Sequence, residues 1–490
     1  MQLLNESKKT LLSEELPYKD LSLKQKLDAA KEIATAALPN ILSSLGNNLK
    51  DLISLFFIGH LNNPLLFAAA GFGVTWMNAF GTAVIFGFAA GFGTLASQAF
   101  GARNYYKFGL LYQKVVATIA MLFLLLCTVL WFTKAELILF GFKEDLATEI
   151  AFFVKCLFLD MAVYSVFETT RFYLLAQNIF HIPAYALLTS TTLHIFWCHI
   201  FVNVMGFGLG GIAIARTITD ATSATICLAY VKLKNPCPES WFPWTKECLK
   251  DLFVFAKEIA SHGSSVYVEW IAFEITTIIL GFLGNVEVLA AHSATLNYLF
   301  VNSTISLGLT LSTSIYVGNA AGEGNVAKTQ KYAYTGIILN FLIVSCLDIL
   351  MLTFRGQIAS FYTTEPEVNS LIKTMLLIYF FGMHADLCCN TFAYILRTLG
   401  QEKFILKGFI TCYYGIGVTL SLIFSVLLGY GFYGVWGSLL TGCAVMLTFN
   451  TIRFFNLDWT YEVNKIHNEM KKKPSVLEDS GRELDILSIE

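Results

Sequence analysis

The chain has 490 residues, of which 56% are hydrophobic and only 14% are charged. This composition is far more apolar than that of ordinary soluble domains, so we expect an integral membrane protein. The net charge of −2 argues against nucleic acid as a partner, because neutralising phosphates requires a dense basic face. The 11 cysteines show neither CxxC nor metal-ligand spacing, so we expect no disulfide framework, no metal and no cofactor.

The first 31 residues are polar and contain no short apolar region of the kind found in signal peptides, so the first span is expected to direct membrane insertion. Twelve apolar runs follow, each long enough to cross a bilayer, which takes about 20 residues. They begin near Ile33, Leu65, Val115, Leu146, Pro183, Gly208, Leu252, Val286, Tyr332, Val368, Phe404 and Gly431. Twelve spans place both termini on one side of the membrane.

The distribution of lysine and arginine indicates which side that is. The two tails and the even-numbered loops hold 25 of the 33 basic residues, whereas the odd-numbered loops hold only Lys134, Lys143 and Arg355. Because basic residues in short loops stay in the cytoplasm, we expect both termini to be cytoplasmic. The tail after Leu457 is polar and charged, and we expect a solvated or disordered extension there.

Two pairs of glycine-containing motifs recur at a nearly constant offset. SQAFGARN (97–104) matches GNAAGEGN (318–325) after 221 residues, and GFGLGGIA (206–213) matches GYGFYGVW (429–436) after 223 residues. Each repeat contains six spans, so the halves share one orientation, as in secondary transporters that bind substrate between two lobes. We therefore predict an all-α membrane protein with twelve transmembrane helices in two six-helix lobes related by an internal repeat.

These patterns divide the chain into five parts. We expect a cytoplasmic amino-terminal tail over 1–31, an N-lobe over 32–231, a cytoplasmic linker over 232–250, a C-lobe over 251–457 and a cytoplasmic carboxyl-terminal tail over 458–490. Because one chain already supplies both lobes, we expect the monomer to be the functional unit.

Acidic residues interrupt the apolar runs of the second half, among them Glu269, Glu274 and Asp386. An ionisable side chain at the centre of a membrane helix costs about 2.5 to 3.5 kcal/mol, so such residues usually have a function. Glu269 and Glu274 point about 140° apart around a helix, so we expect one to line a cavity and the other to face a neighbouring helix. Asp386 begins a polar stripe that continues with Asn390 and Tyr394.

No arginine or lysine lies near the middle of a span in the second half to neutralise these carboxylates. Burial favours the protonated form of a carboxyl group, whereas a nearby cation favours the ionised form. A proton and a cation therefore compete for one position, which can couple export of the cation to entry of a proton. Tyr267, Trp270 and Phe273 can offer aromatic faces to an organic cation. The alternative is that the carboxylates only hold helices together and the aromatic residues only pack.

The sequence also contains six motifs in a specific order: FFIGHLNNPLLFAAAGFG (56–73), SQAFGARN, RFYLLAQNIFHIP (171–183), EWIAFEITTIILGFLGNVE (269–287), YVGNAAGEGN (316–325) and LRTLGQ (396–401). Together they resemble the multidrug and toxic compound extrusion (MATE) family, and its eukaryotic branch more than its bacterial ones. The resemblance covers about residues 32–457. It implies two six-helix lobes and antiport of organic cations or other amphiphilic compounds, driven by protons in the eukaryotic branch and by sodium or protons in bacteria.

The same resemblance implies roles for particular residues. It assigns proton or cation coupling to Glu269, Glu274 and Asp386. It assigns substrate contact to aromatic residues between the glutamates, and with the polar stripe the expected substrate-binding set is Trp270, Phe273, Asn297, Asn390 and Tyr394.

Two positions depart from the family pattern. Many bacterial members carry an aspartate in the first span where this chain has Ser54, so an acidic site of that kind in the N-lobe is not expected. Some animal members carry a glutamate in the eighth span where the best match here is Asn297. The absent aspartate and the resemblance to the eukaryotic branch favour protons over sodium as the coupling ion, and the change at Asn297 allows a different charge preference for the substrate.

Four other classes fit less well. A flippase for lipid-linked precursors, of related fold, would need basic residues in its cavity to hold a pyrophosphate, whereas the candidates here are acidic. A major-facilitator-type transporter usually has a GxxxDRxGRR-like loop, which SQAFGARNYYKFG does not match. An enzyme would need a motif such as HExxH or GxSxG in a suitable context. A channel would need a pore ring built by oligomerisation. We expect the protein in the plasma membrane or in a vacuolar or vesicular membrane.

Overall fold

The structure is a computed structural model that describes residues 18–61, 63–283 and 286–472. Over these residues the chain forms helices and contains no strand. Nine of the described helices are long and apolar enough to cross a membrane, and the bent pair α7 and α8 brings the number to ten if it forms one span. The prediction of an all-α, multi-span membrane protein is therefore confirmed.

The first half of the chain builds one group of helices. Their bounds are η1 (Tyr18–Asp20), α2 (Leu23–Gly59), α3 (Pro64–Met77), η2 (Asn78–Thr82), α4 (Ala83–Gly101), α5 (Tyr105–Trp131), α6 (Thr133–Leu139), α7 (Glu144–Cys156), α8 (Phe158–Ala176), α9 (His181–Cys198), η3 (His199–Val204) and α10 (Gly208–Lys234). The π-helical turn η2 joins α3 to α4 without a break, so these three elements form one candidate span.

The second half builds the other group after two short turns, η4 (Pro238–Ser240) and η5 (Lys246–Leu249). Its elements are α11 (Leu252–Phe282), α12 (Val286–Glu323), α13 (Val326–Tyr362), α14 (Pro366–Thr398), α15 (Glu402–Phe409), η6 (Ile410–Val418), α16 (Thr419–Leu422), η7 (Ile423–Leu427), α17 (Gly431–Phe455) and α18 (Trp459–Lys471). Ten of the twelve predicted spans correspond to candidate spans of the described chain: α3 with α4, α5, α7 with α8, α9, α10, α11, α13, α14, α15 to η7, and α17. The other two predicted spans lie in the helices α2 and α12, which are not among these candidates.

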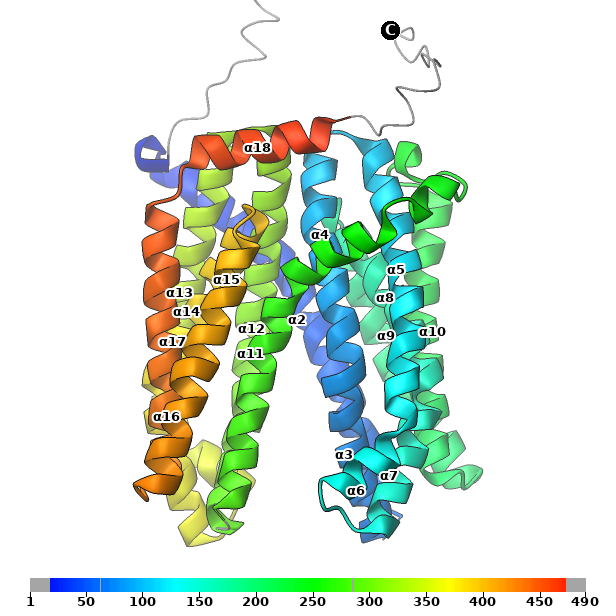
Figure 1. The fold of residues 1–490 in the computed structure, drawn as a ribbon, viewed down its shortest axis with the longest axis vertical. Helices are drawn as coiled ribbons and strands as arrows, with labels where there is room; N and C mark the ends of the chain where they lie inside the picture. The colour runs from blue at the N-terminus through cyan, green and yellow to red at the C-terminus, as the bar shows by residue number, and fades with distance from the viewer. Residues whose placement is uncertain (1–17, 62, 284–285, 473–490) are drawn as a thin grey trace, which may run out of the picture.

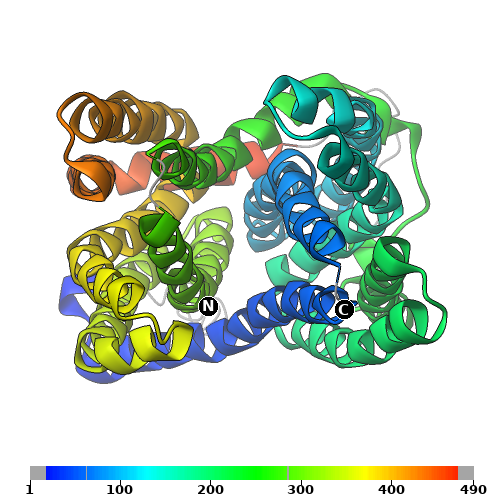
Figure 2. The ribbon, with the colours of Figure 1, turned by 90° about the horizontal axis from the view of Figure 1, so that it is seen from below.

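The two groups lie side by side, and α2 runs between them (Figure 2). The start of α2 contacts the C-lobe, where Tyr332 donates a hydrogen bond of 2.6 Å to Glu32. Its far end packs on the N-lobe, where Gly46 faces Leu187 and Thr191 of α9. The first helix therefore begins at Leu23 rather than near residue 32, and it belongs to both lobes.

Both ends of the described chain lie on one face of the bundle, which we call the terminal face (Figure 1). The lobes meet closely near this face. At the crossing of α4 and α11, a Cβ atom on Gly91 would fall against the backbone of Ile259, and one on Gly87 would lie 3.3 Å from the carbonyl oxygen of Gly263. Only glycine permits two helices to approach this closely.

The buried apolar residues show the same asymmetry between the two ends. One large cluster contains residues of both lobes, among them Phe92 of α4, Ile259 of α11 and Phe454 of α17. A second cluster, which includes Met351 and Trp436, contains only C-lobe residues. The lobes therefore share a core near the terminal face and separate toward the opposite face, which we call the open face (Figure 1).

The segment between the lobes is fastened to the N-lobe. Tyr106 donates a hydrogen bond of 2.6 Å to Glu247, and the amide of Gln113 donates to the carbonyl oxygens of Phe242 and Pro243, each at 3.2 Å. The predicted linker is thus largely an attachment to α5.

The expectation of a solvated or disordered extension after Leu457 is wrong for residues 459–471. They form α18, whose buried residues Trp459, Val463, Ile466 and Met470 follow the helical spacing of one face. The overall polar composition of this segment concealed an amphipathic helix. Residues 473–490 lie outside the described part of the chain.

Candidate functional site

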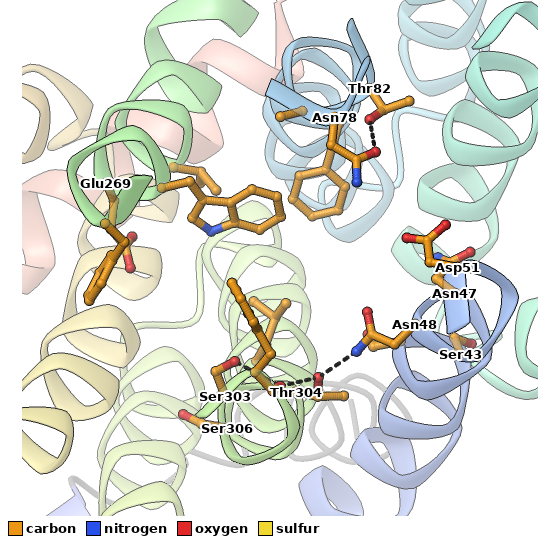
Figure 3. Close-up of a pocket in the computed structure, with 18 of the residues that line it drawn as sticks. Ser43, Asn47, Asn48, Asp51, Asn78, Thr82, Glu269, Ser303, Thr304 and Ser306 are labelled. Carbon is orange, nitrogen blue, oxygen red and sulfur yellow. Dashed lines mark hydrogen bonds between the residues drawn. The ribbon is translucent and has the colours of Figure 1, made fainter. Parts of the chain in front are cut away.

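A cavity of about 480 Å³ lies between the lobes and is lined by side chains from both (Figure 3). Its α11 residues run from Val266 to Glu274 and follow the glycine crossing along that helix toward the open face. Its residues from η2 and α4 run from Asn78 to Phe86, on the same side of that crossing. The cavity therefore lies on the open side of the closely packed contact between the lobes.

The C-lobe wall holds two of the predicted coupling carboxylates next to each other. Glu269 of α11 is 5% exposed, and its Oε1 accepts a hydrogen bond of 2.6 Å from the amide of Asn390 in α14. Asp386, one turn before Asn390, is close enough to Glu269 for an electrostatic interaction. The structure thus brings Glu269, Asp386 and Asn390 together in one site.

Asp386 is held by two donors from neighbouring helices. The hydroxyl of Tyr413, in the π-helical segment η6, donates to its Oδ1 at 2.5 Å. The thiol of Cys443 in α17 donates to the same oxygen at 3.6 Å. Sequence analysis missed both residues, because their contacts arise only when α14, η6 and α17 pack together.

Glu274 also lines the cavity, in contrast to the expectation that only one of the two glutamates would do so. Its side chain is exposed, whereas that of Glu269 is buried. The reason is that α11 presents a wide surface: Val266, Glu269, Trp270, Phe273 and Glu274 span an arc of about 140° at 100° per residue.

Of the three predicted aromatic residues, Trp270 and Phe273 lie in the cavity wall, whereas Tyr267 is not among the lining residues. Trp270 is 44% exposed, and its ring stacks on Phe86 of α4 with centroids 5.9 Å apart and an angle of 15° between the rings. Phe273 packs edge-on against Tyr413, with centroids 6.4 Å apart. A pair of aromatic rings, one from each lobe, therefore forms part of the cavity wall.

Tyr394 lines the cavity, and Arg397 lies against it. The guanidinium carbon of Arg397 is 3.9 Å from the centre of the Tyr394 ring, and Nη1 donates to Ser265 at 3.1 Å. Arg397 is 4% exposed, so a buried cation does stand close to the C-lobe carboxylates although it does not line the cavity. The expectation that no arginine or lysine stands near these carboxylates therefore missed the buried Arg397.

The structure places Asn297 away from the other predicted residues. It is not among the residues that line the cavity, its side chain is exposed, and its amide donates to the carbonyl oxygen of Ser293 one turn earlier in α12. The cavity-lining residues of that stretch of α12 are Leu296, Leu299 and Phe300.

The N-lobe wall carries charged residues that sequence analysis did not select. They are Lys50 and Asp51 of α2, Asp160, Glu168 and Arg171 of α8, and Arg216 and Asp220 of α10. All of them interrupt membrane helices, so the criterion that selected the C-lobe carboxylates, an ionisable group within a span, could have found them as well.

Every basic residue of this wall is paired with a carboxylate. Lys50 donates to both oxygens of Asp220, at 2.7 and 2.9 Å. Arg171 donates to Glu168 at 3.0 and 2.8 Å. Two carboxylates flank the third basic residue, Arg216, which donates to Asp160 at 3.3 Å and also contacts Asp51.

Ser54, which departs from the aspartate that the family resemblance implies for many bacterial members, makes a neutral contact. Ser54 lies 3.0 Å from Nε2 of the buried His194, whose Nδ1 lies 2.8 Å from the hydroxyl of Thr219. The carboxylates of the N-lobe wall stand elsewhere, on α2, α8 and α10.

The two walls therefore differ in charge. Seven carboxylates and three basic side chains line the cavity, and all three basic side chains belong to the N-lobe. The assumption that the cavity holds only acidic residues is wrong, but each lysine or arginine is neutralised within its own wall. The C-lobe wall presents Glu269, Glu274 and Asp386 without a lining cation, which suits a positively charged ligand.

Comparisons with known proteins agree with this architecture. The sequence matches the family model described as MatE over residues 39–200 and 264–423. It is 26% identical over 482 residues to Protein DETOXIFICATION 49 of Arabidopsis thaliana, covering 96% of this chain and 94% of that protein. It is 26% identical over 466 residues to Multidrug and toxin extrusion protein 1 of Xenopus tropicalis, covering 92% and 80%.

The fold is similar to the crystal structure of the eukaryotic MATE transporter AtDTX14, with a TM-score of 0.85 and 20% identity over 91% of this chain and 100% of that chain. The resemblance noted in the sequence is thus confirmed by the matched family, by relatives of similar length and by the fold. The chain belongs to the MatE family of membrane transporters.

Proposed function

We propose that this transporter exports organic cations in exchange for protons, and that the C-lobe carboxylates hold either the proton or the cation. The observation that carries the proposal is the arrangement of Glu269 and Asp386 in one buried site that opens to the cavity and has no basic residue among the cavity-lining residues of its wall. Two carboxylates close together in a poorly hydrated site favour binding of a proton or a cation, because both forms reduce the negative charge.

The surroundings of the pair support such an exchange. Asn390 and Tyr413 donate hydrogen bonds that stabilise the ionised carboxylates, so each can give up its proton when a cation replaces it. A proton entering from the other side then displaces the cation. A gradient of one pH unit supplies about 1.4 kcal/mol, enough for roughly a tenfold gradient of a monovalent cation.

The size and lining of the cavity favour an amphiphilic organic cation. A volume of about 480 Å³ lies within the usual range of sites for small organic molecules. Trp270 and Phe86 offer flat apolar faces, which attract an organic cation more strongly than they attract a hydrated metal ion. Sodium is the alternative coupling ion, and Ser54 and the resemblance to the eukaryotic branch favour protons over it.

We further propose that the terminal face is cytoplasmic, so that the open cavity faces the outside of the cell or the lumen of a vacuole or vesicle. The excess of lysine and arginine in the tails and even-numbered loops supports this orientation. In this orientation the described conformation is outward-facing. Transport then requires the lobes to part at the terminal face and close at the open face, and one chain supplies both lobes.

The test uses purified protein in lipid vesicles loaded at acidic pH and placed in neutral buffer containing a fluorescent organic cation. We expect dye uptake by the wild type, driven by proton efflux, and little uptake by Asp386→Asn, which keeps the size of the side chain but cannot exchange a proton. A sodium gradient without a pH gradient should give no uptake.

The matched control is Asp145→Asn, which makes the same change at an exposed position of α7 outside the cavity. This variant should transport dye like the wild type. Equal uptake by Asp386→Asn and the wild type would remove Asp386 from the mechanism, and uptake driven only by sodium would make sodium the coupling ion.

A further inference from the structure

Helix α18 lies across the terminal face and reaches from one lobe to the other (Figure 1). Its amino-terminal half is anchored to the C-lobe. The Trp459 ring packs on Tyr334 of α13 and Phe454 of α17, with centroids 5.9 and 5.2 Å apart. Gln401, between α14 and α15, donates a hydrogen bond of 2.8 Å to the buried carboxylate of Glu462.

The middle of α18 contacts the point where the lobes meet. Nδ1 of His467 lies 2.6 Å from the carbonyl oxygen of Gly322 near the end of α12. Gly322 in turn packs against the backbone of Gln98 in α4, so closely that a Cβ atom would not fit. His467 therefore binds a C-lobe residue that touches the N-lobe directly.

The carboxyl-terminal end of α18 is held by the N-lobe. The side chain of Asn104 donates to the carbonyl oxygen of Met470 at 2.9 Å, and the ammonium group of Lys107 donates to that of Glu469 at 2.8 Å. The last carbonyl groups of a helix have no partner within it and carry partial negative charge, so these donors cap α18 well.

We propose that α18 is a latch that holds the two lobes together at the terminal face and must release Asn104 and Lys107 in each transport cycle. The inference rests on the proposed function, because alternating access requires the lobes to part at this face. The contacts of α18 are mostly with α12 and α13 of the C-lobe, whereas hydrogen bonds from the N-lobe reach only its carboxyl-terminal end. Release of that end, with α18 staying on the C-lobe, is therefore the least costly way to open.

A reversible cross-link tests the latch directly. The pair Lys107→Cys and Glu469→Cys is joined by a short bifunctional methanethiosulfonate reagent in protein in which the exposed Cys346 is replaced by serine. We expect the cross-linked protein to lose at least about nine tenths of its dye uptake and to regain it after reduction. Each single-cysteine variant should show the same uptake before and after treatment with the reagent. Full uptake by the cross-linked pair overturns the proposal.

A second measurement needs no transport, so it separates failure of the latch from failure of the proposed function. Spin labels at Leu139→Cys in α6 and Phe282→Cys in α11, which are 86% and 84% exposed at the open face, report the distance between the lobes there. Lys107→Met should raise the ratio of short to long distances about fivefold, the effect of losing one hydrogen bond of about 1 kcal/mol.

Three further variants test whether the change in the distance between the lobes depends on the contacts that hold α18. His467→Ala should shift the distances in the same direction, and Lys107→Arg should leave them as in the wild type. Lys465→Met makes the same change as Lys107→Met on the exposed face of α18 and should have no effect. Unchanged distances in both Lys107→Met and His467→Ala, or an equal shift in Lys465→Met, overturn the proposal.

Discussion

Asn390 donates a hydrogen bond of 2.6 Å to Glu269 and thereby joins α14 to α11 at the wall of the cavity. The two residues are 121 positions apart in the chain, and each lies within a predicted membrane span. The contact places an amide donor on a carboxylate that has no basic residue beside it in the cavity lining. Its removal should weaken binding of a cation, because the ionised form of Glu269 loses its donor.

Asn390→Ala should bind a fluorescent organic cation about tenfold more weakly than the wild type at neutral pH, since a hydrogen bond to a charged group contributes about 1.5 to 3 kcal/mol. Fluorescence anisotropy of the dye in detergent measures this affinity. Asn297→Ala, at the exposed asparagine outside the cavity, provides the control and should bind as the wild type does. Equal losses in both variants would contradict the geometry of the site.

Tyr413→Phe should also weaken dye binding, by roughly tenfold, because it removes the hydroxyl that stabilises the ionised form of Asp386. The adjacent Tyr414 offers a matched control. Its hydroxyl donates to the backbone carbonyl oxygen of Val268 at 2.8 Å rather than to a carboxylate. Tyr414→Phe should therefore leave the affinity within about twofold. A larger loss in Tyr414→Phe than in Tyr413→Phe would show that the hydroxyl on Asp386 is not what matters.

Lys50→Met should destabilise the protein by about 3 to 5 kcal/mol, because it leaves the carboxylate of Asp220 buried without a partner. Lys134→Met breaks an exposed ion pair of similar length with Glu144, in which the side chains are 41% and 74% exposed. That change should cost no more than about 1 kcal/mol. Thermal unfolding of the two variants in the same detergent compares them, and similar melting temperatures would mean that the Lys50 pair contributes little.

Gly91→Ala should reduce dye uptake by roughly tenfold. A methyl group there meets the backbone of Ile259, and overpacking of this kind costs about 1 to 3 kcal/mol against the conformation in which the terminal face is closed. Gly437→Ala in α17 adds the same methyl group where no atom lies within 4 Å, and it should leave uptake unchanged. Normal uptake by Gly91→Ala would show that the helices can separate there without loss of function.

The sequence was sufficient to predict the helical, multi-span class and to place Glu269 and Asp386 inside long helices, because hydropathy and ionisable residues in apolar runs are local signals. It could not predict that Tyr413 reaches Asp386, since that contact depends on how η6 packs against α14. Periodicity placed Glu269 and Glu274 on different faces correctly, but it could not reveal that the cavity is wide enough for both.

Two other features were within reach of the sequence and were still missed. The charged residues of α8 and α10, such as Asp160 and Arg216, meet the same criterion as Asp386. The spacing of Trp459, Val463, Ile466 and Met470 predicts one apolar helix face, although the segment as a whole is polar. The family resemblance drew attention to the C-lobe carboxylates and away from the charged residues of α8 and α10. The polar composition of the tail concealed the apolar face of α18.

The position of α2 has a consequence for how the protein can be made in pieces. In the C-lobe, Asn40 of α2 donates a hydrogen bond to Ser312 of α12. In the N-lobe, Lys50 of α2 pairs with Asp220 of α10. A fragment starting at Asp251 would therefore expose a groove that α2 normally occupies. Two co-expressed fragments should assemble into a folded protein only if α2 can still pack against both lobes. The two halves of the chain therefore cannot fold independently of each other.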